Sequence, residues 1–346
     1  MIETNIWFWV LFNAFVLGML ALDLGVFHRR AHVVRAREAA AWVGVWVTLA
    51  LLFGLGLLYF AGARAAATFL TGYLVEQALS VDNVFVIVMI FAYFGIPARY
   101  QHRVLFWGII GALVMRGTFI GLGALLIQRF HWVLYVFGGL LIATGVRMAL
   151  QRDAEFDAER NPVYRLARRL LPFTTEYDGQ RFFTAVGGRW VVTPLFLVLL
   201  LVEFTDLIFA VDSIPAIFGV TRDPFIVYTS NVFAIIGLRS LFFLLVGIVN
   251  RFHLLKYGLA TILTFIGVKM VGEPWFEIPI VLSLAVVAGV LALAVALSLA
   301  FPRAAALEPH GVKGRRGSVF GAVAEGSGTR HAARGTRKGV GGNTPA

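Results

Sequence analysis

Residues 201–218 read LVEFTDLIFAVDSIPAIF, an apolar run that contains three carboxylic acids and a proline. Together with the apolar residues from 191 onward, the run is long enough to cross a bilayer core as a helix, which takes about 20 residues. Each ionised side chain at the bilayer centre costs about 2.5–3.5 kcal/mol, so acids in such a helix usually serve a function. The stretch predicts a membrane span that carries a functional site.

The composition extends this interpretation to the whole chain. Of the 346 residues, 59% are hydrophobic and 14% are charged, and the mean hydropathy is +0.83. Soluble domains carry about 25% charged residues, so a soluble globular fold is excluded. We predict an all-α, polytopic transmembrane helix bundle of about nine spans, at 6–27, 40–60, 68–94, 104–127, 133–150, 191–218, 225–249, 254–271 and 278–301.

The cysteine count and the net charge exclude several functions. The chain has no cysteine, which rules out disulfides, thiolate zinc sites and cysteine nucleophiles. Its net charge of +11 lies mostly in loops and in the tail, where basic residues set membrane topology, so we expect no nucleic-acid partner. No nucleotide-binding or catalytic motif is present, and we do not expect an enzyme.

Charge and composition also divide the chain. We predict a transmembrane domain over 1–301 and a disordered, basic cytoplasmic tail over 302–346, which is rich in Gly and Arg. An insert at about 151–190 contains RNPVYRLARRLLP, which predicts a short amphipathic surface helix. Lys and Arg gather in alternate loops, including this insert and the tail. The positive-inside rule then places the N-terminus outside and the C-terminus in the cytoplasm of a bacterial inner membrane.

Two parts of the chain repeat each other. EQALSVDN at 76–83 and DLIFAVDS at 206–213 share an acid, four residues, Val-Asp and a small polar residue. Arg116 then matches Arg239, and GVRM at 145–148 matches GVKM at 267–270. Repeat one covers about 68–150 and repeat two about 191–272. Each has three helices, so the two copies must be inverted, a plan common in secondary transporters with a site at the repeat interface.

Five acids inside predicted spans would cost on the order of 15 kcal/mol if all were ionised and unpaired. Protons, a bound metal or the intramembrane arginines must compensate them. One alternative is that acids and arginines form ion pairs that hold the bundle together, but two arginines cannot neutralise five acids. The oxygen donors favour a hard divalent cation such as Mn²⁺, Mg²⁺ or Ca²⁺. The candidate metal ligands are Glu76, Asp82, Asn83, Glu203, Asp206, Asp212 and Ser213, with Arg116 and Arg239 as charge-compensating residues.

Helix geometry complicates a single ion site. In both motifs the second acid stands six residues beyond the first, about 9 Å along an ideal helix and well round it. A straight helix would therefore not direct both acids at one ion. Pro215 removes a backbone donor and clashes with the carbonyl of Val211. This predicts a kink that frees the carbonyl and swings Asp212 inward.

The chain resembles the TerC family of integral membrane proteins, within the LysE-like transporter superfamily. The similarity rests on ALDLGVFHRRAH (21–32), GYLVEQALSVDNVFV (72–86), the run at 201–218 and SNVFAIIGLRSLFFLL (230–245), and covers the chain to Phe301. It implies a multi-pass bundle associated with tellurium-ion resistance and, in some members, manganese export, with intramembrane acids at the five positions named above.

We therefore expect an exporter of divalent metal cations, foremost Mn²⁺, that works by alternating access and proton exchange. Its partners would be the transported cation and the lipid bilayer, and it would have no permanently bound cofactor. The alternative is a non-transporting membrane scaffold that assists insertion or metalation of other proteins.

Replacing Asp82 or Asp212 with Asn should abolish metal-dependent efflux, because the neutral amide cannot balance a cation. The protein should still reach the membrane. The measurement is manganese accumulation in cells that express each variant at the level of the parent chain. Unchanged accumulation would contradict the predicted role of these acids.

Overall fold

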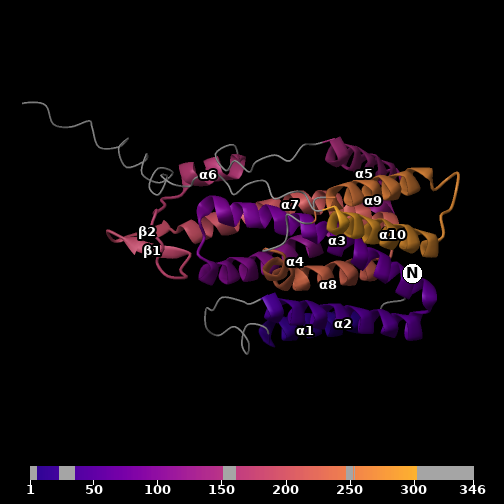
Figure 1. Cartoon of the computed structure of the whole chain (residues 1–346), viewed down its shortest axis with the longest axis horizontal. Coiled ribbons are helices and arrows are strands. Elements are labelled where there is room, and N and C mark those ends of the chain that lie inside the picture. Colours follow the sequence, from indigo (N-terminus) through magenta and orange to yellow (C-terminus); the bar gives the residue numbers. More distant parts are fainter. Residues whose placement is uncertain (1–5, 23–35, 151–160, 247–251, 253, 302–346) are drawn as a thin grey trace, which may run out of the picture. The chain divides into compact units, whose positions relative to one another are not determined.

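A computed structural model describes residues 6–22, 36–150, 161–246, 252 and 254–301 (Figure 1). These ranges form helices joined by short loops, with one β-hairpin. The elements are α1 (Ile6–Leu22), α2 (Ala36–Ala61), α3 (Ala63–Phe94), α4 (Ala98–Arg129), α5 (Val133–Leu150), α6 (Pro162–Leu170), β1 (Phe183–Val186), β2 (Arg189–Val192), α7 (Pro194–Val220), α8 (Pro224–Leu245), α9 (Leu255–Gly272) and α10 (Ile280–Ala300).

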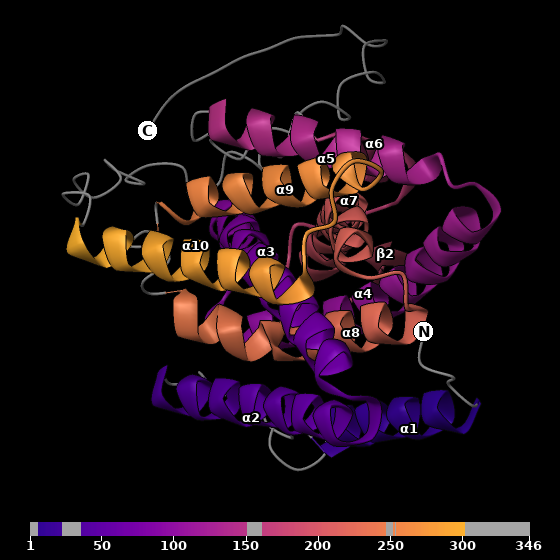
Figure 2. The same ribbon diagram turned by 90° about the vertical axis from the view of Figure 1, so that its right-hand side faces the viewer.

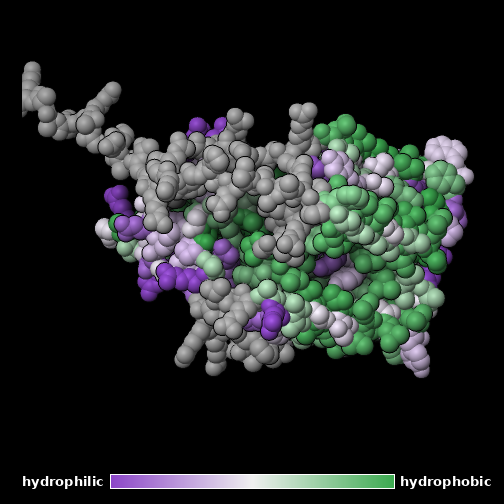
Figure 3. Space-filling view, viewed as in Figure 1, coloured by the Kyte–Doolittle hydropathy of each residue, from purple (hydrophilic) through white to green (hydrophobic). Residues whose placement is uncertain are grey.

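The helices confirm a polytopic all-α membrane protein. Eight of them are long and apolar enough to span a bilayer, namely α2, α3, α4, α5, α7, α8, α9 and α10. Helix α1 is shorter, because residues 23–27 of the first predicted span lie outside the described residues. Figure 3 shows apolar residues over α9 and α10, whereas hydrophilic residues gather around the β-hairpin. The predicted tail, 302–346, also lies outside the described residues.

The insert contains the short helix that its sequence predicts. Helix α6 begins where the Asn161 side chain accepts hydrogen bonds from the backbone N–H groups of Val163 (2.9 Å) and Tyr164 (3.4 Å). Asn is a favoured N-cap residue, and Pro162 at the first helical position needs no donor there. Tyr164 and Ala167 are buried while Arg165 is exposed, so the helix is amphipathic.

The β-hairpin is a feature that the sequence analysis missed. Phe183 pairs with Val192 and Val186 with Arg189 in antiparallel register. The turn uses Gly187 and Gly188, both with positive φ (58° and 78°), which glycine adopts without strain. The sixth span was predicted to start at 191, but α7 starts at Pro194 because the preceding residues pair with β1.

Polar and aromatic contacts tie the insert to the adjoining ends of α3 and α4. The Tyr177 hydroxyl donates to the carbonyl oxygen of Phe94 at 3.3 Å, where α3 ends at the left-handed residue Gly95. Burial raises the pKa of the Tyr177 phenol, so the hydroxyl stays protonated and able to donate. The Arg103 guanidinium lies 4.9 Å above the ring of Phe182. The insert is therefore anchored to the bundle.

The bundle packs helices of one predicted repeat against their counterparts in the other. Helix α3 packs on α7, α4 on α8 and α5 on α9. The contacts between non-matching helices of the two repeats also correspond. Helix α3 contacts α8, and α4 contacts α7. Helix α8 is the most completely buried of the candidate spans and lies among α2, α3 and α4 (Figure 2). This pairing is compatible with two inverted repeats, which remain a prediction.

Helices α5 and α9 approach each other at small residues. A Cβ added to Gly267 would stand 2.7 Å from the carbonyl oxygen of Gly138, and one added to Gly145 would stand 2.7 Å from that of Ala260. Gly145 and Gly267 are matched in the predicted repeats, so the two contacts are equivalent. Small residues let helix backbones come this close inside a membrane.

Gly267→Ala should destabilise the bundle by about 1–3 kcal/mol, because its Cβ meets backbone that cannot rotate away. Gly139→Ala is the matched control, since a Cβ there meets nothing within 4 Å. The measurement is thermal unfolding of both purified variants in detergent. If Gly267→Ala and Gly139→Ala melted at the same temperature, the result would contradict the close contact between the backbones of α5 and α9.

Candidate functional site

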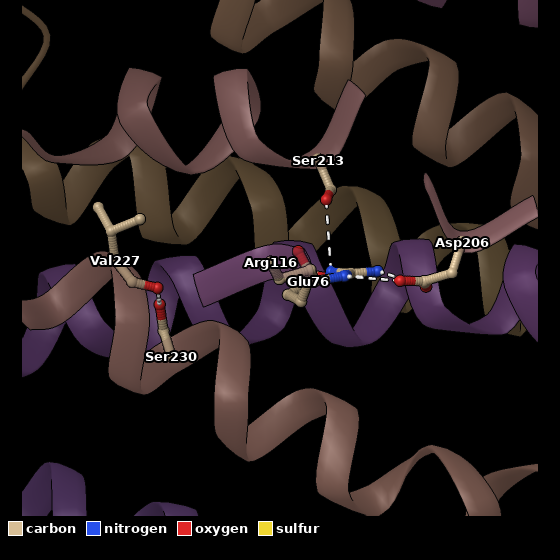
Figure 4. Close-up of polar contacts among 6 residues, drawn as sticks. All are labelled: Glu76, Arg116, Asp206, Ser213, Val227 and Ser230. Carbon is tan, nitrogen blue, oxygen red and sulfur yellow. Dashed lines mark hydrogen bonds and ion pairs between the residues drawn. The ribbon is translucent and has the colours of Figure 1, made fainter. Parts of the chain in front are cut away.

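A buried arginine on α4 joins side chains of α3 and α7. The Arg116 guanidinium forms an ion pair with Glu76, donates to Asp206 through Nη2 (3.1 Å) and Nε (3.4 Å), and donates from Nη1 to Ser213 Oγ at 3.3 Å (Figure 4). Arg116 is 2% exposed and Glu76 is 0% exposed. We call Arg116, Glu76, Asp206 and Ser213 the Arg116 centre.

Helix periodicity explains why these residues meet. Asp206 and Ser213 are seven residues apart on α7, so they lie two turns apart on one face of the helix. Helix α3 packs against α7, which brings Glu76 to the other side of the guanidinium. Two nitrogens of Arg116 contact the two oxygens of Asp206, a geometry that fixes the planar group well.

The Arg116 centre has more acids than bases. With Glu76 and Asp206 ionised and one arginine between them, the three side chains carry a net charge of −1. Among the described residues, Glu76 Oε2 has no hydrogen-bond partner. An uncompensated charge in a low-dielectric interior is strongly unfavourable, so a proton or a cation must complete the balance.

Two further predicted ligands lie on the helices that carry the acids of this centre. The Glu203 carboxylate interacts electrostatically with Asp206 and packs against Gly111 of α4, where it leaves no room for a Cβ. Asn83 is buried and lies seven residues after Glu76 on α3, hence on the same helix face. Within the described ranges, its Oδ1 atom has no hydrogen-bond partner.

The two remaining acids face other helices. Asp212 Oδ1 accepts a hydrogen bond from Thr144 Oγ1 of α5 at 2.9 Å, and Arg147 is its charged neighbour. Asp82 interacts electrostatically with Lys256 of α9. Helix α7 continues as one helix through Pro215, and the expected inward swing of Asp212 is not seen.

The structure therefore does not gather all five acids around one ion. In the part of the chain that the structure describes, no group of three or more His, Asp or Glu side chains is close enough to hold a metal. The physical reason is that a residue six positions along a helix points well away from the first, whereas a residue seven positions along returns to the same face.

The second intramembrane arginine lies elsewhere on α8. Arg239 is 4% exposed, and its Nη1 is 3.2 Å from Nε2 of His102, near the start of α4. His102 was not among the predicted site residues. In the sequence, His102 looks like any histidine near the end of a span, because it lies in the first turns of α4. It meets Arg239 only because α8 packs against α4.

A cavity of about 770 Å³ opens at the end of the bundle viewed in Figure 2. Thr68 on α3 and Phe218 on α7 line it, together with the charged residues Arg64, Arg222, Asp223, Lys269, Glu273 and Glu277. Thr68 precedes Glu76 by eight residues, about 12 Å along the helix. Sequence reasoning missed this cavity because its walls come from seven helices and two loops that are far apart in the chain.

The fold and the buried centre define a multi-pass, all-helical integral membrane protein with a charged group inside the bundle. A sequence model described as "Integral membrane protein TerC family" matches residues 61–306, and the chain belongs to this family.

A Myxococcus xanthus membrane protein named STKORF319 is 54% identical over 291 residues, which cover 84% of this chain and 91% of the relative. Relatives with the provisional name membrane-bound redox modulator Alx include that of Escherichia coli K12, 51% identical over 292 residues (82% and 91%). A Rickettsia bellii membrane protein is 43% identical over 291 residues (84% and 96%). No solved structure matches.

Arg116→Met should lower the free energy of unfolding by about 3–5 kcal/mol, because it leaves Glu76 and Asp206 buried without their partner. The measurement is unfolding of the purified protein in detergent. Adding Glu76→Gln and Asp206→Asn to Arg116→Met should recover most of the loss, since no buried charge then remains. Equal stability of the single and triple variants would contradict the ion-pair assignment.

Proposed function

We propose that the chain exports divalent metal cations, foremost Mn²⁺, across the membrane in exchange for protons. The observation that carries this proposal is the Arg116 centre, in which acids from matched positions of two helix motifs share one arginine inside the bundle. In this proposal the Arg116 guanidinium, a positive charge fixed to the protein, occupies the site when no ion is bound. An entering metal ion displaces it from the carboxylates.

The charge balance favours a divalent ion. Glu76, Asp206 and the neighbouring Glu203 contribute −3 when ionised, and Arg116 contributes +1, which leaves −2. One divalent cation makes the set neutral, and so do two protons. Metal binding requires deprotonated carboxylates, so protons that enter the site help to expel the metal. This reciprocity supports metal/proton exchange.

The donor atoms favour a hard metal. Carboxylate, amide and hydroxyl oxygens suit Mn²⁺, Mg²⁺ and Ca²⁺, whereas Cu⁺ and Zn²⁺ prefer sulfur or imidazole. The whole chain contains no cysteine, so thiol chemistry of its own is unavailable for a redox role of the kind that the relatives' name describes. Metal export is also consistent with the tellurium-ion resistance associated with the family.

The helix packing supports alternating access. The contacts between α3–α5 and α7–α9 occur in corresponding pairs, as expected for two units that rock against each other. With the N-terminus outside a bacterial inner membrane, the cavity faces outward and the insert faces the cytoplasm. The present conformation would then be open toward the exit side of an exporter.

One observation favours a scaffold as the second candidate. On the β-hairpin, Val186 and Trp190 are 56% and 73% exposed, and the insert that carries them is anchored to α3 and α4. Exposed apolar side chains on a rigid hairpin suit a protein partner. Val186→Ser with Trp190→Ser should leave a transporter active and disable a docking factor.

The proposed function predicts that Glu76→Gln and Asp206→Asn abolish Mn²⁺ transport, because each variant removes a charge that the ion must balance. The measurement is Mn²⁺ uptake into vesicles reconstituted with purified protein, with and without a proton gradient. Asp178→Asn is the control, since this half-buried acid lies in the insert beside Arg181 and Thr184 and is not part of the Arg116 centre. Uptake that is absent from the parent chain, or unchanged in Glu76→Gln, would refute the proposal.

A further inference from the structure

Asn231 on α8 is a buried amide without hydrogen bonds. It is 0% exposed, and neither Oδ1 nor Nδ2 has a partner among the described residues. Such a group costs about 1–3 kcal/mol relative to an apolar side chain of the same shape. Its neighbours Thr229 and Ser230 are equally buried, but each donates to a carbonyl of its own helix at 2.8 Å. Asn231 is thus the exception in this segment.

The neighbours of Asn231 show that its part of α8 packs against α3, the helix that carries Glu76. Val227, one turn earlier on the same helix face, belongs to the same extended apolar cluster as Val75 and Ile214, which adjoin Glu76 and Ser213 in sequence. Figure 4 shows Val227 and Ser230 on α8 as a group separate from the Glu76–Arg116 pair. Ser230 also lies against Gly72, one turn before Glu76. Asn231 therefore stands on a helix that packs against both α3 and α4, which carry Glu76 and Arg116.

The unpartnered atoms in this region are mostly oxygens. Glu76 Oε2 and Asn83 Oδ1, on one face of α3, lack partners within the described residues, as does Asn231 Oδ1. Only Asn231 Nδ2 is an unpartnered donor there. Glu76 and Asn83 lie about 10 Å apart along α3, too far to bind one ion together, so the Glu76 and Asn231 oxygens are the ones that offer a hard divalent cation its preferred ligands. A carboxamide adds an oxygen ligand without changing the charge balance.

We propose that Asn231 is a ligand of the transported divalent cation and binds it through Oδ1. The proposal rests on the proposed export function and extends its site to α8. A ligand role explains why position 231 carries an amide, which destabilises the metal-free bundle, rather than an apolar side chain such as leucine. When the ion is bound, the Asn231 oxygen acquires the partner that it lacks in the structure.

The test measures Mn²⁺ binding to the purified full chain in detergent, from the loss of the electron paramagnetic resonance signal of free Mn²⁺. Asn231→Leu should weaken the affinity by about tenfold or more, comparable with the loss of other groups that support a metal site. Asn231→Asp keeps an oxygen ligand and adds a negative charge, so it should bind Mn²⁺ at least as well as the parent chain. Thr229→Val is the matched control, because its hydroxyl is bonded within its own helix.

Metal-free thermal unfolding separates a ligand from a structural residue. Asn231→Leu should melt at the same temperature as the parent chain or higher, because it removes an unsatisfied buried amide. A lower melting temperature, or unchanged Mn²⁺ affinity in Asn231→Leu, would overturn the ligand role and leave the export proposal standing. If the parent chain itself binds no Mn²⁺, the export proposal fails and the ligand role fails with it.

Discussion

The contact of Arg116 with Glu76 and Asp206 constrains the rest of the bundle. Water cannot solvate these charges inside a membrane, so the helices that carry them must stay within reach of one another. Helices α3, α4 and α7 are thereby held around one point, and α8 fills the space beside them. The same contact leaves an excess negative charge, which gives the centre its capacity for a cation or for protons.

Tight backbone packing and unpartnered polar atoms occur in different parts of the bundle. Helices α5 and α9 meet at glycines, where backbone lies close to backbone and leaves no room for change. At Glu76 and Asn231, by contrast, the protein interior contains polar atoms that have no hydrogen-bond partner among the described residues. A core selected for stability alone would contain apolar residues there. The proposed cation would supply the partner that these buried oxygens lack among the described residues.

The cavity and the insert mark the two ends of the bundle as different. One end is hollowed between α2, α3, α7 and α9, and the other is covered by a hairpin and a short helix that bond to the ends of α3 and α4. This asymmetry, within helices that pack in corresponding pairs, is compatible with the proposed alternating access, in which a transporter opens to one side at a time.

The amino-acid sequence by itself determined the spans, the short helix of the insert, the family and the residue types of the site. Apolar length and motif spacing are local properties, so they can be read without the fold. Only the tertiary structure decided which acids meet, because a shift of one residue turns a side chain by about 100° and sends Asp212 to α5 while Ser213 faces Arg116. The hairpin, the cavity and the position of Asn231 likewise depend on contacts between distant segments, which no local pattern encodes.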